Sequence, residues 1–308
     1  MDERTIATVA LKDGASSLRE TLEEASRWVE AAAAQGAQLA VLPETINLLH
    51  RKEASAPLQE FALENWRQQT AMLCETAARS KIALVLPLLT RENNVISNRF
   101  YVLSAGGDLL GYYQKRVPAP GEKCSGVESG NSDPIQWEGL TIGGAICFDV
   151  YYPNAVFDPQ IESGADFFVI PSLTPAGALL DSYAVIYGVP FVLAYSPWSR
   201  ILDRDATELA AGGYRSETLR FGFASPVLVS RINFDAVTLF ADRNQEKMGD
   251  VQRHYGHKVR IRFNQPNCLF TLESRSHDLS VHEVMREFGL ISRRDYFAQN
   301  SPSRTERE

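Results

Sequence analysis

Short apolar runs and longer amphipathic segments alternate along the first two thirds of this chain of 308 residues. Runs of strand length occupy residues 5–11, 38–42 and 81–86, and segments of helical length occupy residues 16–34 and 57–80. Alternating strands and helices form layered structures, because each strand must bury its apolar side chains against a neighbouring layer. This part of the chain therefore predicts a mixed α/β fold.

Glycine-containing turns add strand hairpins to this pattern. The turn at residues 105–108 joins predicted strands at 97–104 and 109–115, and a turn at 138–139 joins predicted strands at 134–137 and 140–146. Alternation then resumes, with predicted helices at 153–163 and 177–187 and predicted strands at 166–170 and 190–195. The middle of the chain thus adds both hairpins and further α/β units.

The last third predicts a hairpin of residues 225–232 with 236–240, strands at 258–263 and 268–272, and an amphipathic helix at 280–288. No internal repeat or linker divides the chain. We expect one domain over residues 1–275, followed by a C-terminal helix and polar tail at 276–308 that is associated with a dimer and disordered at its end.

The amino-acid composition indicates which classes of partner the chain is expected to bind. The chain is 44% hydrophobic and 22% charged with a net charge of -7, as in soluble globular proteins, and an acidic chain argues against nucleic acid or membrane as its partner. The N-terminus lacks the form of a secretory signal. Four scattered cysteines (Cys74, Cys124, Cys147, Cys268) predict reduced thiols in a cytoplasm. Histidine spacing indicates no metal site.

Three apolar runs end on residues that can do chemistry. Glu44 follows the run at 38–43, Lys115 follows the run at 108–114, and Cys147 follows the run at 141–146. A side chain placed where a buried strand breaks into a turn faces a cleft instead of the core. A carboxylate, an amine and a thiol together suit acyl transfer through a thioester, with no metal or organic cofactor.

Proton transfer from the thiol to the carboxylate depends on how the surroundings change the pKa of each group. A free thiol has a pKa near 8.5, and a free glutamate is about four units too acidic to hold the thiol's proton. Burial and a neighbouring lysine must therefore close the gap. The lysine can also stabilise the oxyanion that forms when the thiolate attacks a carbonyl or nitrile carbon, helped by a backbone N–H beside the cysteine.

The three strand ends resemble the ordered motifs of the nitrilase superfamily of carbon–nitrogen hydrolases. The motifs here are Val-Leu-Pro-Glu at 41–44, Lys-Arg-Val-Pro-Ala-Pro-Gly-Glu at 115–122, and Gly-Gly-Ala-Ile-Cys-Phe-Asp at 143–149, within a resemblance covering about residues 5–240. The resemblance implies a four-layer α-β-β-α sandwich whose subunits pair. It also implies that Glu44 is the general base, Lys115 the oxyanion stabiliser and Cys147 the nucleophile. Glu122 would be a second acid that orients Lys115 or the substrate amine.

Residues after the cysteine depart from the family pattern. Many members carry an Arg or His followed by Pro-Glu, where this chain has Tyr-Tyr-Pro-Asn at 151–154. We expect Phe148, Tyr151 and Tyr152 to line the substrate pocket, and Ser172, which follows a predicted strand, to contact substrate. Asp149 is interpreted as a turn residue that holds its own backbone. The segment 197–221 matches no known pattern and is a candidate lid or specificity loop.

The predicted activity is hydrolysis of a small amide at a C–N bond other than a peptide bond. An N-carbamoyl-amine hydrolase, a nitrilase and an N-acyltransferase are alternatives on the same scaffold, and Phe148 stands where a nitrilase more often has Trp. A non-catalytic binding protein that kept the fold is the alternative from another class. The expected partners are a small amide, carbamoyl or nitrile substrate and a second copy of the chain, as a homodimer or higher oligomer.

Overall fold

The structure is a computed structural model that describes residues 1–308 except 52–56, 123, 125–133, 215–225 and 300–308. Two six-stranded sheets form its centre. The first has the order β12 (Val227–Asn233), β1 (Glu3–Val9), β2 (Leu39–Val41), β3 (Ala83–Glu92), β4 (Val95–Leu103), β5 (Leu109–Gln114). The second has the order β11 (Glu208–Gly212), β10 (Ser199–Leu202), β9 (Phe191–Ala194), β8 (Phe167–Pro171), β7 (Leu140–Gly144), β6 (Ile135–Trp137).

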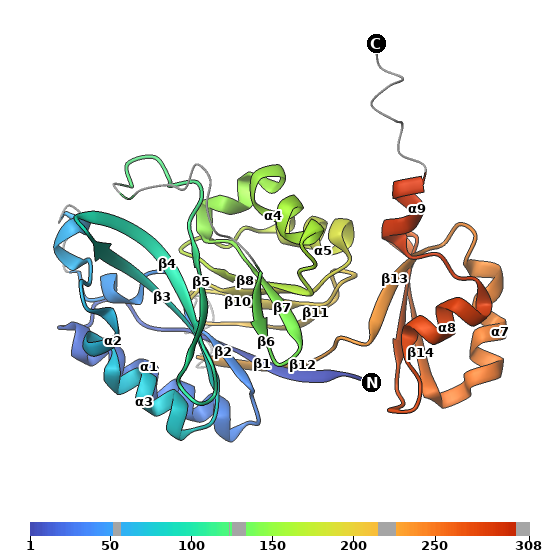
Figure 1. Ribbon diagram of the computed structural model, residues 1–308, viewed down its shortest axis with the longest axis horizontal. Helices are drawn as coiled ribbons and strands as arrows, with labels where there is room; N and C mark the ends of the chain where they lie inside the picture. Colours follow the sequence, from blue (N-terminus) through green and yellow to red (C-terminus); the bar gives the residue numbers. More distant parts are fainter. Residues whose placement is uncertain (52–56, 123, 125–133, 215–225, 300–308) are drawn as a thin grey trace, which may run out of the picture.

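Helices cover the outer faces of both sheets (Figure 1). The first sheet carries α1 (Leu18–Ala34), α2 (Trp66–Gln69) and α3 (Ala71–Arg79), and the second carries α4 (Pro153–Glu162) and α5 (Ala178–Tyr187). Side chains alternate along each strand: Leu39 and Val41 of β2 pack between the sheets, whereas Ala40 packs toward the helices. This is the predicted α-β-β-α sandwich, and the mixed α/β fold is confirmed.

The two sheets approach each other closely where β7 ends. A Cβ atom on Gly144 would lie 2.5 Å from Phe100 and 2.7 Å from Tyr113, both of the first sheet. Glycine is therefore required at this crossing. It brings the residues that follow β7 against the first sheet, where β4 and β5 supply the facing side chains.

The segment at 57–80 is not the single helix that its length predicted. It forms a 3-10 helix, η2 (Leu58–Phe61), and then α2 and α3. Leu63 lies between η2 and α2 and pairs with β3. Its N–H donates to Leu89 O at 3.0 Å, and its carbonyl accepts from Arg91 N at 2.9 Å. Pairing with the end of β3 replaces the helical hydrogen bonds at this point, so the helix is broken.

The segment proposed as a lid contributes two strands to the second sheet. Its described residues, 197–214, contain β10 and β11, which pair as an antiparallel hairpin. Arg200 bonds Asp181 at 2.8 Å and Glu208 at 2.6 Å, so this arginine is bound into the scaffold. Residues 215–221 of the proposed lid lie outside the described part of the chain.

A third sheet follows the sandwich, in the order β13 (Ala236–Phe240), β15 (Leu269–Ser274), β14 (Val259–Asn264). It packs with α7 (Gln245–Tyr255) and α8 (Val281–Phe288) around a core of its own, and its remaining elements are η4 (Gly256–Lys258), η5 (Gln265–Asn267) and α9 (Arg293–Gln299). We call residues 236–299 the C-terminal unit, which lies beside the sandwich in Figure 1.

Two sequence expectations concern the C-terminal unit. The expected domain boundary at residue 275 stays a prediction; it falls between β15 and α8, whose side chains share one core. The expected hairpin of 225–232 with 236–240 does not form, because β12 pairs with β1 over seven residues while β13 pairs with β15. The expected disordered tail lies in residues 300–308, outside the described part. No described helix has the length and apolar character that a membrane span requires.

Candidate active site

The three predicted strand ends meet in one cavity, which lies at the ends of strands from both sheets. Glu44 follows β2, Lys115 follows β5, and Cys147 begins the 3-10 helix η3 (Cys147–Tyr151) after β7. The cavity has a volume of about 660 Å³, and its lining includes these three residues together with Glu122. The tertiary structure thus brings all four predicted catalytic residues together.

Lys115 lies between two carboxylates. Its Nζ is 2.9 Å from Glu44 Oε1 and 2.7 Å from Glu122 Oε2, and its side chain is 2% exposed. Burial acts to lower the pKa of Lys115, but the Glu44 and Glu122 carboxylates outweigh it and raise the pKa well above its ordinary value. The lysine is therefore a fixed cation, and it cannot serve as the base.

Glu44 is held at both carboxylate oxygens. Oε1 accepts hydrogen bonds from Lys115 and, at 2.8 Å, from Asn98 Nδ2, while Oε2 accepts one from the backbone N–H of Leu173 at 3.0 Å. The segment between β2 and η1 (Ile46–Leu48) carries Glu44, so its backbone is fixed by the first sheet. The carboxylate therefore has one orientation in the cavity.

Glu122 is held by the loop that follows Lys115. Its Oε2 accepts the Ala119 N–H at 2.9 Å, and its Oε1 accepts from Asn98 Nδ2 at 2.9 Å. Burial acts to raise the pKa of Glu122, but Lys115 and these hydrogen bonds hold it below its ordinary value. Glu122 is thus an ionised partner of the lysine at neutral pH.

Cys147 is 7% exposed and lies at the turn from β7 into η3. Its φ of +47° is in the left-handed region, which is uncommon for residues with a Cβ and is a feature of strained functional positions. Burial and the nearby Glu44 carboxylate raise the pKa of the thiol above its ordinary value, whereas Lys115 acts to lower it. The resting thiol is therefore protonated at neutral pH, and a base must accept its proton during attack.

Asp149 holds two loops of the site together. Its buried carboxylate accepts hydrogen bonds from the backbone N–H groups of Ile146 at 2.9 Å, Arg116 at 3.1 Å and Val117 at 2.8 Å, and from Tyr113 OH at 2.9 Å. The expectation that Asp149 holds its own backbone is confirmed. No feature of the sequence indicated that it also holds the loop carrying Lys115.

Ser172 lies beside Cys147, and its hydroxyl acts to lower the pKa of that thiol. It is 1% exposed, its hydroxyl donates to Thr174 O at 2.7 Å, and it accepts the Thr174 N–H at 2.9 Å. These bonds shape the loop whose next residue, Leu173, donates to Glu44. Thr174 Oγ1 lies 3.8 Å from Cys147 Sγ. Ser172 is outside the described cavity lining, and its contact with substrate stays a prediction.

The three aromatic residues after the nucleophile cluster with one another. The Phe148 ring centroid lies 5.3 Å from that of Tyr151 and 5.7 Å from that of Tyr152. Tyr151 is 51% and Tyr152 43% exposed, and the described cavity lining contains none of the three. Their predicted role as pocket walls stays a prediction that this geometry does not support.

Sequence reasoning missed Asn98 and the apolar wall of the cavity. That wall comprises Leu48, Leu49, Pro57, Leu58, Leu89 and Leu173. Leucines along a chain carry no signal that distinguishes a pocket wall from a core. Asn98 did leave a signal, because asparagine is depleted in strands and this one lies within a strand that was predicted.

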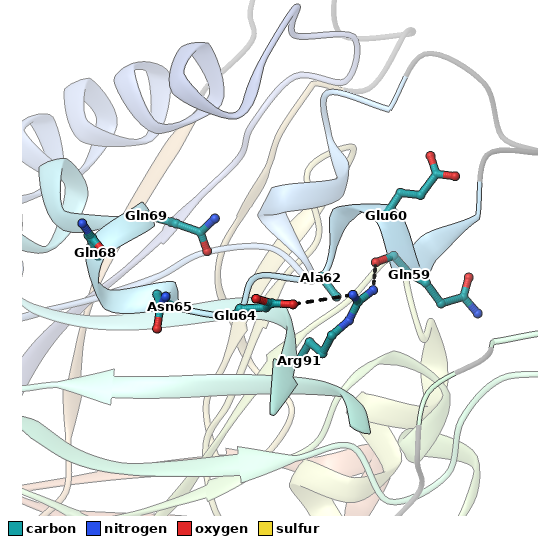
Figure 2. Close-up of a pocket in the computed structure, with 8 residues that line it drawn as sticks. All are labelled: Gln59, Glu60, Ala62, Glu64, Asn65, Gln68, Gln69 and Arg91. Carbon is teal, nitrogen blue, oxygen red and sulfur yellow. Dashed lines mark hydrogen bonds and ion pairs between the residues drawn. The ribbon is translucent and has the colours of Figure 1, made fainter. Parts of the chain in front are cut away.

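A second pocket shares Gln59 with the catalytic cavity, and Figure 2 shows the residues that line it. It has a volume of about 710 Å³ and a mostly polar lining of Gln59, Glu60, Ala62, Glu64, Asn65, Gln68, Gln69 and Arg91. Arg91 is bound there, to the Gln59 carbonyl and, at 3.7 Å, to Glu64. The lining holds no thiol, lysine or histidine, so this pocket has no nucleophile for the expected chemistry.

Among the described residues, no cluster of three or more metal-binding side chains occurs.

The four layers, with a cysteine, a lysine and two glutamates in one cavity, match the nitrilase superfamily that the motifs resemble. The carbon-nitrogen hydrolase family model matches residues 5–181, and the chain belongs to this family. No curated protein matches the sequence.

Solved structures of an amidase from Nesterenkonia sp. AN1 have the same fold. Its crystal structure is 20% identical, with a TM-score of 0.62 over 82% of this chain and 96% of the amidase. A double mutant of it, with glutamate changed to glutamine and cysteine to alanine, binds acrylamide and is 19% identical, with a TM-score of 0.62 over 82% and 97% of the two chains. At these identities the likeness establishes the fold.

Proposed function

We propose that this protein hydrolyses the C–N bond of a small amide through a cysteine thioester. One observation carries the proposal: Lys115 is fixed between two carboxylates in the same cavity as a buried thiol at a strained turn. A nucleophile, a base and a fixed cation are the parts that acyl transfer needs, and each has a separate candidate here.

In the first half-reaction, Cys147 Sγ attacks the carbonyl carbon of the amide while Glu44 accepts the thiol proton. Lys115 is the cation that stabilises the negative charge developing on the carbonyl oxygen. The C–N bond then breaks, Glu44 gives its proton to the departing nitrogen, and ammonia or an amine leaves. The acyl group remains on Cys147 as a thioester.

In the second half-reaction, water attacks the thioester carbon and Glu44 accepts a proton from that water. The C–S bond breaks, the carboxylic acid leaves, and the sulfur recovers the proton from Glu44. Glu122 does not exchange protons in this scheme. It holds the Lys115 ammonium in place, because its carboxylate lies 2.7 Å from Nζ.

The cavity supports a small acyl group as substrate. Its volume is about 660 Å³, and leucines form much of the wall beside the reactive groups. Two Nesterenkonia amidase mutants are bound to acrylamide and to butyramide, and a third carries the acetamide moiety of fluoroacetamide on its active-site cysteine. We therefore place short aliphatic amides first. Arg51 also lines the cavity, so amides carrying a carboxylate belong in the panel.

Ammonia release from a panel of aliphatic amides, carboxylate-bearing amides, N-carbamoyl amino acids and nitriles tests the proposal. We expect wild type to release ammonia from at least one amide and Cys147→Ala to release none above background, because the variant has no nucleophile. Near-full activity in Cys147→Ala would overturn the mechanism. Release from nitriles or carbamoyl compounds alone would replace the amide by that substrate.

The non-catalytic alternative predicts that the Cys147 thiol is unreactive. A catalytic Cys147 is expected to react with iodoacetamide despite its burial, and peptide-resolved mass spectrometry separates it from the exposed Cys268. An inert Cys147 together with no ammonia release would favour a binding protein.

We also propose that the chain pairs into a homodimer, which light scattering measures, and that it is located in the cytoplasm.

A further inference from the structure

The catalytic cluster holds an unbalanced charge. Lys115 is the one cation that contacts Glu44 and Glu122 in the described structure, and both carboxylates contact it. Two carboxylates sharing one ammonium leave one net negative charge in a buried place. Two carboxylates at close range repel each other, so the cluster needs a hydrogen-bond donor besides Lys115.

Asn98 supplies the missing stabilisation. Its Nδ2 donates to Glu44 Oε1 at 2.8 Å and to Glu122 Oε1 at 2.9 Å, so both amide hydrogens are used on carboxylates. Lys115 bridges the same two glutamates from another side. The four side chains therefore form a closed ring in which each donor contacts both acceptors.

The strand fixes Asn98 in this position. Asn98 lies on β4 and is 1% exposed, and its carbonyl accepts the Lys115 N–H at 2.9 Å. Its Oδ1 is buried and has no hydrogen-bond partner. Rotating the amide would place Oδ1 against two carboxylates, so the carboxylates determine its orientation.

A neutral donor suits this position better than a charged one. A second cation would balance the charge, but it would compete with the thiol for the carboxylate oxygens of Glu44. A carboxylate would add to the repulsion. An amide with two hydrogens stabilises both anions and leaves the net charge unchanged.

We propose that Asn98 is a positioning residue that bridges Glu44 and Glu122, offsets their repulsion and fixes the base for its reaction with Cys147. The assignment of Glu44 as base rests on the function proposed above, whereas the ring itself is independent of the substrate. Loss of Asn98 removes one of the hydrogen bonds that lower the pKa of Glu122, so this carboxylate binds its proton at higher pH.

The test compares the pH profiles of wild type and Asn98→Leu, a substitution of similar size without donors. We expect the acid limb of hydrolysis to move up by about one pH unit or more, and kcat at neutral pH to fall about 10- to 100-fold with a smaller change in KM. The acid limb of Cys147 alkylation by iodoacetamide is expected to move in the same direction, because the same carboxylates set it.

Asn244→Leu is the matched control. Asn244 is also fully buried, and its side chain bonds Phe240 and Ile291 in the C-terminal unit, away from the cavity. We expect this control to lower stability and leave both pH profiles in place. If Asn98→Leu does not fold, Asn98→Ser retains a single donor and is expected to give a smaller shift in the same direction.

Superimposable alkylation profiles for wild type and the Asn98 variant would overturn the role of Asn98, whatever the activity. A shifted alkylation profile in a protein that releases nothing from the panel would support the ring and reject the proposed function. The two inferences therefore fail separately.

Discussion

At the scale of the residue, each charged group of the site is held by a small set of specific partners. Glu44, Lys115 and Glu122 are each bound by specific donors or acceptors, and Cys147 is neutral at rest. Buried charges persist only when they are paired and hydrogen-bonded. The chemistry and the stability of this cluster are consequently coupled through the same contacts.

Glu122→Gln tests that coupling. The pKa of Glu122 is depressed in the folded protein, so its contribution to stability is present above its unfolded pKa of about 4.3 and is lost as the pH falls below that value. We expect the variant to be less stable than wild type at pH 7, with a difference that shrinks toward pH 3. Urea unfolding at the two pH values measures this.

A stability difference that is equal at pH 7 and pH 3 would contradict the lowered pKa. The variant is also expected to lose at least about tenfold in kcat, because one of the two carboxylates that fix the Lys115 ammonium is then neutral. Glu64→Gln is the control, since Glu64 is exposed and its contact with Arg91 is at 3.7 Å.

At the scale of the element, the site is built where strands end. The turn after β7 and the loop after β5 belong to different sheets, and the Asp149 carboxylate joins them. Sequence patterns predicted each strand end separately. They could not predict that one carboxylate serves both, because that contact exists only once the sheets have packed.

Asp149→Asn is expected to lower the free energy of unfolding by about 2–4 kcal/mol. The amide's NH₂ group is a donor, and in place of a carboxylate oxygen it leaves buried N–H groups without an acceptor. Activity is expected to fall as well, since the turn carrying Cys147 loses its support. Urea unfolding and ammonia release measure the two effects. Asp158→Asn, on α4 with Tyr187 as partner, is the control of the same chemistry; equal losses in both variants would contradict the role of Asp149.

At the scale of the whole molecule, polar contacts dock the C-terminal unit on the sandwich. Arg262 of β14 pairs with Asp203 and, at 3.6 Å, with Asp205 beyond β10, and with Glu273 of β15 at 3.1 Å. Thr271 donates to Asp205 at 2.8 Å. The apolar core of the unit is on its other side, with α7 and α8.

Arg262→Met is therefore expected to loosen the docking and to leave the catalytic cavity intact, because none of these residues lines it. We expect faster limited proteolysis around residue 235, a loss of about 1–3 kcal/mol in stability, and unchanged kcat. Arg253→Met, at an exposed pair on α7, is expected to change neither measurement. A large fall in kcat for Arg262→Met would show that the unit shapes the active site.

Local sequence pattern was sufficient to predict the mixed α/β class, most of the strands, and the order of the glutamate, lysine and cysteine at three strand ends. These follow from periodicity and from residue types at turns, which are local properties. Long-range packing accounts for three other features: Asn98 bridges the two carboxylates, pairing with β3 breaks the segment at 57–80, and β13 pairs in a third sheet instead of with β12. Each of these depends on contacts between residues far apart in the chain, and local pattern does not encode which distant groups will meet.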